Sequence, residues 1–316
     1  MPELTYTSED LLTSIRNSGM IPNTGATGSE DADLLRHASE GIWSYIVAGV
    51  AQLREQYYYK REREALVSGQ QTYRIPKRAL WNKLTNVWHV LNSQRVPLRE
   101  IPKREIQRYG RIAGAGAPAG YTIDGNYLRP VPDESPSYTG FWEWCYYVRP
   151  GNLVKSAEYR RVVVVSSPSV TLDSAVPSSW TTANTFDIHS PESGCDYRAI
   201  SLSASLVSGT GITFSEEIDG SVFGSHVVEV GDYVCLENTV AVPGVPPELQ
   251  PQVARLAAMH WAEATGNRKK FDMHVKVFSE FLQATYGAME TRVEEKPMRI
   301  GAGGITPLDI QGRDYW

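Results

Sequence analysis

Residues 227–266 read VVEVGDYVCLENTVAVPGVPPELQPQVARLAAMHWAEATG, and the pattern of apolar residues changes character within them. Residues 227–236 are rich in β-branched and aromatic side chains, which predicts a strand. Prolines at positions 243, 246 and 247 then form a stiff linker, because proline fixes its own backbone and cannot extend a sheet. From Leu249 the apolar residues recur at helical spacing, and Gly266 ends that helix. The chain therefore passes here from a β region into a closing helix.

Helical spacing also marks residues 7–67 and the segment after the closing helix. Thr7 and Asp10 are placed to form a capping box at the start of a first helix. An apolar stripe predicts a second helix from about residue 29, and a last helix is predicted over residues 268–289. Because helices lie at both ends of the chain, we expect the two sets to pack together. The contacts expected with the closing helices involve Leu35, Ile42 and Ile46.

The middle of the chain has the period of strands. Residues 121–123 and 127–129 flank Asp-Gly-Asn, which is the clearest hairpin signal in the sequence. Residues 65–68 and 72–75 flank Gly-Gln and predict another hairpin. Further strands are predicted over residues 84–90, 141–148, 162–165, 169–172, 199–206 and 211–214. Short strands separated by turn signals are typical of an antiparallel sandwich or barrel.

The expected fold class is therefore α+β. Terminal helices form a helical domain, an antiparallel β-sandwich or barrel domain is inserted into it, and an extended C-terminal arm follows. The predicted boundaries are 1–61 for the N-terminal helical part, 62–242 for the β-rich domain, 243–292 for the closing helices and 293–316 for the arm.

Composition narrows the classes of function. Of the 316 residues 41% are apolar and 21% charged, which is ordinary for a globular protein and excludes wholesale disorder. A net charge of −5 disfavours a protein whose main role is to clamp nucleic acid. No apolar run approaches the length of a membrane span, and the widely spaced cysteines favour a reducing compartment. The 8 tryptophans and 17 tyrosines suit large interfaces and β cores equally well.

Catalytic and metal-binding motifs are missing from the sequence. It contains no nucleotide-binding glycine loop, no zinc-protease motif and no serine-hydrolase elbow. Cys145 and Cys235 lie in predicted strands and are expected to be buried, while His260 lies on an apolar helix face and is expected at the core or its boundary. An acid pair for glycoside hydrolysis would have to come from Glu143, Glu216, Glu217 or Asp219, and nothing selects any of them. We predict a protein that is not an enzyme and that needs no cofactor or metal.

A basic segment lies between residues 95 and 111, where only two glutamates oppose the cations. Its members are Arg95, Arg99, Lys103, Arg104, Arg108 and Arg111. Such a segment could face phosphates, pair with a neighbouring subunit or be a solvated face. Because the whole chain is acidic, subunit or tail contacts and a solvated face rank above DNA binding.

The last twenty residues combine flexible glycines with apolar and aromatic side chains. Apolar residues on a pliable segment gain little free energy unless another surface buries them, so a docking arm is favoured over a frayed terminus. The residues expected to dock are Arg299, Ile300, Ile305, Leu308, Ile310, Arg313, Tyr315 and Trp316.

Six segments in the same order resemble a known family. They are VSGQQTYRIP (67–76), PLREIPKREIQRYG (97–110), YTIDGNYLRPVP (121–132), WEWCYYVRPGNLV (142–154), VEVGDYVCLENTVAVPGVPPELQPQVAR (228–255) and RVEEKP (292–297). Together they resemble the head-to-tail adaptor, or connector, proteins of short-tailed bacteriophages. The resemblance covers residues 30–297, and GDYVCLENTVAVPGVPPEL is its most specific part. The last nineteen residues depart from the family pattern.

The resemblance implies a structural virion protein. Family adaptors form a ring, typically dodecameric, that docks under the portal protein, extends the channel for double-stranded DNA and carries the tail nozzle and fibre proteins. The helical domain abuts the portal, and the C-terminal arm reaches along it. Assembly takes place in the host bacterial cytoplasm, without a membrane. Two alternatives are a tail-associated cell-wall hydrolase, and a glycan-binding tail component that would use exposed aromatics such as Trp142, Trp144 and Trp180.

Overall fold

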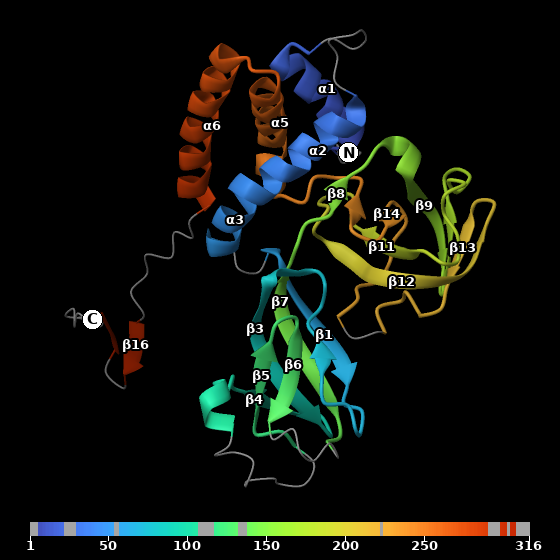
Figure 1. Cartoon of the computed structure of the whole chain (residues 1–316), viewed down its shortest axis with the longest axis vertical. Coiled ribbons are helices and arrows are strands. Elements are labelled where there is room, and N and C mark those ends of the chain that lie inside the picture. Colours follow the sequence, from blue (N-terminus) through green and yellow to red (C-terminus); the bar gives the residue numbers. More distant parts are fainter. Residues whose placement is uncertain are drawn as a thin grey trace.

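A computed structural model describes most of the chain, and it has a mixed α+β fold, as the sequence predicts (Figure 1). Helices from both ends of the chain lie together at one end of the molecule, and two separate β bodies lie below and beside them. The described residues are 6–21, 30–53, 57–106, 117–131, 138–221, 224–289, 298–301 and 304–307.

The helices begin and end close to the predicted positions. Their bounds are Ser8–Gly19 (α1), Asp31–Gly41 (α2), a π-helical turn Ile42–Ile46 (η1), Val47–Leu53 (α3), Gln250–Ala264 (α5) and Arg268–Met289 (α6). The predicted capping box is present, and the Thr7 N–H donates to Asp10 Oδ2 at 3.0 Å. Both α1 and α2 pack against α5, which in turn packs against α6. Gly41 permits this close approach, because a Cβ there would lie 3.0 Å from the Leu256 Cβ.

One β body is a four-stranded antiparallel sheet in the order β1-β7-β3-β4, with a three-stranded sheet β2-β6-β5 beside it. The bounds are Tyr59–Ala65 (β1), Tyr73–Arg74 (β2), Ala79–Leu91 (β3), Gln94–Leu98 (β4), Gly120–Asp124 (β5), Tyr127–Val131 (β6) and Phe141–Val148 (β7). The hairpin predicted around Asp-Gly-Asn is confirmed, with Asp124 opposite Tyr127. A short 3-10 helix, Lys103–Glu105 (η3), follows β4.

The hairpin predicted over residues 65–75 is wrong. Strand β1 pairs with β7, and β2 pairs with β6, so these neighbours in sequence do not pair with each other. The charged run 60–64, expected at the end of the helical region, forms β1 instead. Charged side chains suit a strand at the edge of a sheet, where one side faces water.

The second β body is a closed six-stranded barrel in the order β10-β13-β12-β11-β14-β9. Its strands are Tyr159–Ser166 (β9), Ser169–Leu172 (β10), Thr185–His189 (β11), Tyr197–Ser208 (β12), Gly211–Phe214 (β13) and Tyr233–Leu236 (β14). The strand predicted over 227–236 is reduced to β14 and a single bridge between Val227 and Asp219. Gly231, with a φ of 107°, turns the chain between them.

A two-stranded parallel ladder joins the barrel to the helices. It pairs Asn152–Leu153 (β8) with Thr239–Val240 (β15), and the 3-10 turn Pro247–Leu249 (η5) then leads into α5. A further 3-10 turn, Ser156–Glu158 (η4), precedes β9. One apolar core runs from the helices into the four-stranded sheet, and a separate core fills the barrel.

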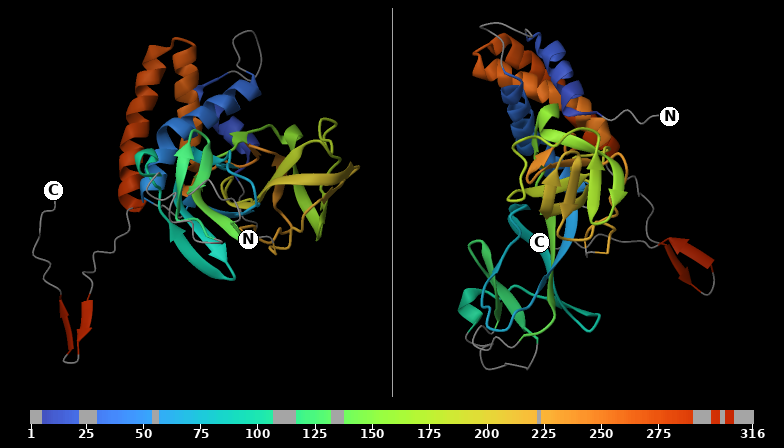
Figure 2. Two further views of the ribbon diagram at one scale, coloured as in Figure 1. Left: turned by 60° about the horizontal axis from the view of Figure 1, so that its bottom comes forward. Right: turned by 90° about the vertical axis from the view of Figure 1, so that its right-hand side faces the viewer.

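The last described strands form a hairpin of their own. Met298–Gly301 (β16) pairs with Gly304–Pro307 (β17), and Ile300 lies opposite Ile305. Figure 2 shows this hairpin apart from the helices and from both β bodies in two directions of view.

Candidate functional site

The described residues of the basic segment do not form one continuous surface. Arg95 lies in β4, Arg99 follows it, and Lys103 and Arg104 lie in η3. Arg108 and Arg111 fall outside the described residues. Arg95 therefore lies on the sheet, whereas the other described cations lie in or just before η3.

Arg95 takes part in an ion-pair triad on the sheet. The Glu143 carboxylate is fully buried in β7, and Arg63 in β1 donates to its Oε2 from two nitrogens, each at 3.0 Å. Arg95 pairs with the other oxygen and lies 4.4 Å from the centre of the Trp88 ring. Because a buried carboxylate needs compensating charge, the triad stabilises the sheet across β1, β7 and β4.

Lys103 and Arg104 lie at the surface. The Lys103 ammonium is 2.9 Å from Asp124 Oδ1, and this hydrogen bond lowers the pKa of the Asp124 carboxyl, with Arg129 contributing from 3.3 Å. The Arg104 side chain is 85% exposed and has Glu105 at 3.9 Å. Exposed ion pairs of this kind contribute little to stability, so these two cations can form contacts with another molecule.

Only part of the predicted docking arm can be placed. Arg299 and Ile300 lie in β16, and Ile305 lies in β17. Leu308, Ile310, Arg313, Tyr315 and Trp316 lie outside the described residues. Their predicted role stays a prediction.

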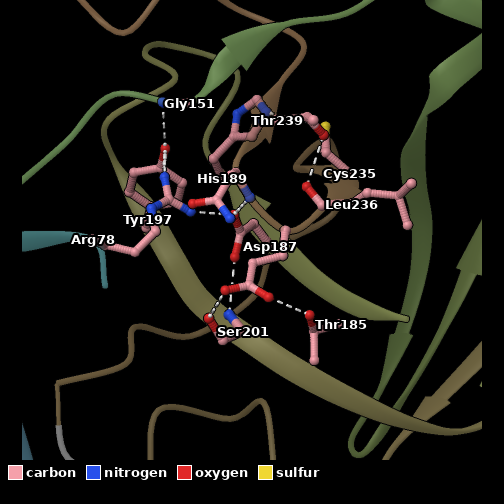
Figure 3. A network of polar contacts seen from close by, with 12 residues as sticks. Arg78, Gly151, Thr185, Asp187, His189, Tyr197, Ser201, Cys235, Leu236 and Thr239 are labelled. Atoms are coloured by element: carbon pink, nitrogen blue, oxygen red, sulfur yellow. Dashed lines mark hydrogen bonds and ion pairs between the residues drawn. The ribbon is translucent and has the colours of Figure 1, made fainter. Parts of the chain in front are cut away.

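Buried polar groups connect the first β body to the barrel (Figure 3). Arg78, in the turn before β3, forms an ion pair with Asp187 in β11 and donates to the Tyr197 hydroxyl in β12. Asp187 also accepts from the Ser201 N–H at 2.9 Å and from the Asn238 N–H at 2.8 Å. Burial raises the pKa of the Asp187 carboxyl, and the Arg78 guanidinium opposes that shift. With every charge paired, the network fixes the barrel against the turn.

Sequence reasoning did not identify this network. Its members lie far apart in the chain, 109 residues for Arg78 and Asp187. The one local signal is an aspartate between Phe186 and Ile188, in a segment whose neighbours are apolar. A charged residue that interrupts an apolar strand indicates a buried partner.

A cysteine and a histidine approach each other in the barrel wall, as in some nucleophilic enzymes. Cys235 Sγ lies 3.6 Å from His189 Nε2, and that nitrogen also accepts from the Ala241 N–H at 3.1 Å. His189 Nδ1 lies 3.0 Å from the Ser190 carbonyl, which fixes the neutral tautomer with the proton on Nδ1. Burial lowers the pKa of His189 to about 4 and raises the pKa of the Cys235 thiol. The pair is therefore neutral, and both side chains are fully buried.

The other residues singled out in the sequence lie in strands, at the helical core and on a barrel loop. Cys145 and Cys235 are buried in strands, as predicted, and His260 lies at the edge of the helical core. The acids Glu216, Glu217 and Asp219 are exposed on a barrel loop, far from the buried Glu143 in sequence and fold. The expectation of exposed tryptophans at 142, 144 and 180 is wrong, because they are 0%, 1% and 4% exposed. Trp142 and Trp144 lie on one face of β7, and that face packs into the apolar core, where the Trp142 and Tyr73 ring centres are 5.7 Å apart.

A cavity of about 690 Å³ lies between the start of β1 and the barrel. Lys60 extends along its wall, and burial lowers the pKa of this amine to about 8. Tyr57, Ser193, Asp196 and His226 also line it. Within the described ranges, no group of three or more histidine, cysteine or acidic residues is placed to hold a metal ion. No helix in the described part of the chain is long and apolar enough to cross a membrane.

No protein-family model matches the chain, and no curated protein matches it in sequence.

Proposed function

We propose that the protein is a head-to-tail adaptor of a tailed bacteriophage. The observation that carries the proposal is the ordered set of segments that resemble that family. Its most specific part, residues 231–249, runs through β14, β15 and η5 into α5, where barrel, ladder and helices meet. Val240, Val245 and Leu249 of this stretch are fully buried. Because residues 231–249 connect the barrel to the helices, a resemblance in this segment supports a common architecture with the adaptor family and not only a similar composition.

In this role the terminal helices, α1 to α3 together with α5 and α6, form the domain that abuts the portal. The β region, residues 62–242, forms the wall of the DNA channel and the platform for nozzle and fibres. Identical subunits close a ring, typically dodecameric in the family, through contacts that join one face of a subunit to a different face of the next. The protein belongs to the neck of the virion and assembles in the host cytoplasm.

The C-terminal arm is the proposed portal contact. A two-stranded hairpin by itself is marginally stable in water, because it buries little apolar surface. The hairpin of β16 and β17 lies apart from both cores, so a partner surface is what would stabilise it. The exposed Lys103 and Arg104 are proposed to serve contacts with a neighbouring subunit or the tail.

The rival functions lack a supporting site among the described residues. The tryptophans that would bind glycans are buried, and Glu143 is held by two arginines. The neutral, buried cysteine and histidine offer no nucleophile. A structural role without catalysis fits these observations best.

Electron microscopy of the protein mixed with its cognate portal ring tests the proposal. We expect added density under the portal with the full chain, and none with a chain truncated after Lys296 that keeps its helical circular dichroism. The matched control is Glu158→Ala, an exposed position that leaves the arm intact and lies outside the proposed contact surfaces. A truncated chain that binds portal as well as the full chain would assign the contact to the helices alone. A full chain that never binds portal would refute the adaptor proposal.

A further inference from the structure

A shallow groove of about 450 Å³ lies where the helices meet the first β body. Two tryptophans line it, Trp43 from η1 and Trp81 from β3, and their exposed fractions are 36% and 65%. Arg74, Lys77 and Arg149 complete the rim. This set of five residues is called the tryptophan groove.

The backbone at Trp81 is held in an unusual conformation. Trp81 and Asn82 have φ values of 53° and 55°, in the left-handed region, at the point where the β3–β7 register shifts. Each such residue costs about 1–3 kcal/mol, so the surrounding structure must enforce it. Asn82 does this by donating to the Gly125 carbonyl at 3.1 Å and to Asn126 Oδ1 at 3.0 Å. The bulge thus directs a large apolar ring toward solvent.

The charge of the groove is one-sided. No carboxylate is among the residues that line it, and none of its three cations forms an ion pair with any described residue. Arg149 lies 5.7 Å from the centre of the Trp43 ring. Apolar rings between unpaired cations are suited to a partner that presents carboxylates beside aliphatic side chains.

The barrel presents such a surface. Val227 and Val230 are 53% and 69% exposed, and Glu216 and Asp219 lie on the adjacent loop. A bridge between Asp219 and Val227 holds the two segments together, with the Val228 N–H donating to the Ile218 carbonyl at 3.1 Å. Arg198 pairs with Glu229 nearby, whereas neither Glu216 nor Asp219 has an ion pair within the described residues. This surface, Glu216, Asp219, Val227 and Val230, is called the acidic ridge.

We propose that the acidic ridge of one subunit seats in the tryptophan groove of a second copy of this chain. The two surfaces belong to different bodies of one subunit, and the exposure of Trp81 and Val230 shows that they do not cover each other there. A contact between unlike faces leaves one groove and one ridge open at the ends of any pair. It therefore continues from subunit to subunit, as a ring requires. This contact rests on the proposed adaptor ring, and it identifies the two surfaces that join neighbouring subunits.

Charge exchange between the two surfaces tests the contact. The groove variant is Arg74→Glu with Lys77→Glu, and the ridge variant is Glu216→Lys with Asp219→Lys. Each variant alone opposes like charges, so we expect the loss of the assemblies that the wild type forms in sedimentation velocity at high concentration. An equal mixture restores both contacts, acidic groove with basic ridge and basic groove with acidic ridge, and should recover them. Lys83→Glu and Glu158→Lys are the matched controls outside both surfaces, and they should assemble like the wild type.

Disulfide trapping detects the contact even where association is weak. Lys77→Cys and Val230→Cys are made in separate chains and mixed under mild oxidation, and the native cysteines are all buried. A covalent dimer of the two variants, absent when either is oxidised alone with wild type, supports the contact. Failure to trap it, or charge variants that assemble like wild type, overturns the inference. Rings that still form with portal in that case would leave the adaptor proposal standing with other subunit surfaces.

Discussion

Removing the Arg78 side chain should weaken the attachment of the barrel to the first β body, because this side chain joins the turn before β3 to strands β11 and β12. Its guanidinium pairs with Asp187 and the Tyr197 hydroxyl on the barrel and donates to the Arg149 carbonyl at 3.3 Å next to β7. The Arg78 and Asp187 side chains are 4% and 0% exposed. Arg78→Met keeps much of the length of the side chain and removes all of these polar contacts.

The expected cost follows from what is left behind. Asp187 keeps two backbone N–H donors but loses its counter-charge in a fully buried site, and breaking a buried pair in this way costs about 3–5 kcal/mol. The double variant Arg78→Met with Asp187→Leu removes both charges. Because apolar replacement of a whole buried pair is often near neutral, we expect it to be more stable than Arg78→Met alone.

Urea unfolding read by hydrogen exchange and mass spectrometry measures this in each body separately. Peptides from β12 report on the barrel, and peptides from β3 report on the sheet. Arg104→Met is the matched control, since that side chain is 85% exposed, and it should change stability by no more than about 0.5 kcal/mol. A loss for Arg78→Met as small as that of the control would refute the reasoning. A double variant no more stable than Arg78→Met would show that lost packing, not a stranded charge, causes the effect.

Two further predictions concern other buried groups. Glu143→Gln should lower the free energy of unfolding by about 1–3 kcal/mol, because Arg63 and Arg95 are a third exposed, at 33% and 36%, and water screens part of their charge. Urea unfolding compared with the exposed control Glu216→Gln measures this loss. Equal losses in the two variants would contradict a stabilising role for the triad. The pKa of His189 is lowered to about 4 in the folded state, against about 6.5 in the unfolded chain. The unfolded chain therefore takes up a proton first as the pH falls. The free energy of unfolding should drop between pH 6.5 and pH 4, by up to about 3 kcal/mol. Urea midpoints measured across the same pH range should vary less in His189→Gln, and an unchanged slope would assign the pH dependence to other groups.

Elements whose signals are local could be predicted from the sequence. The last helix, α6, begins after Gly266 and Asn267 and spans Arg268–Met289, as the helical spacing of its apolar residues and the preceding Gly-Asn pair predict. The capping box at Thr7 and the hairpin at Asp124 depend on residues three or four positions apart, so the sequence contains all that they need. The α+β class and the burial of Cys145 and Cys235 follow from patterns of the same short range.

What the sequence could not determine depends on pairing between distant segments. The expected hairpin over residues 65–75 failed because β1 and β2 find better partners in β7 and β6, more than fifty residues further along. The same pairing places β7 between β1 and β3 and brings Arg63 and Arg95 to Glu143. Trp142 and Trp144 are buried because their face of β7 packs into the apolar core, with Trp142 against Tyr73 of β2. Barrel closure, the Arg78–Asp187 pair and the tryptophan groove likewise arise only when remote strands meet. Local free energies select helices and turns, whereas register and burial are properties of the whole folded chain.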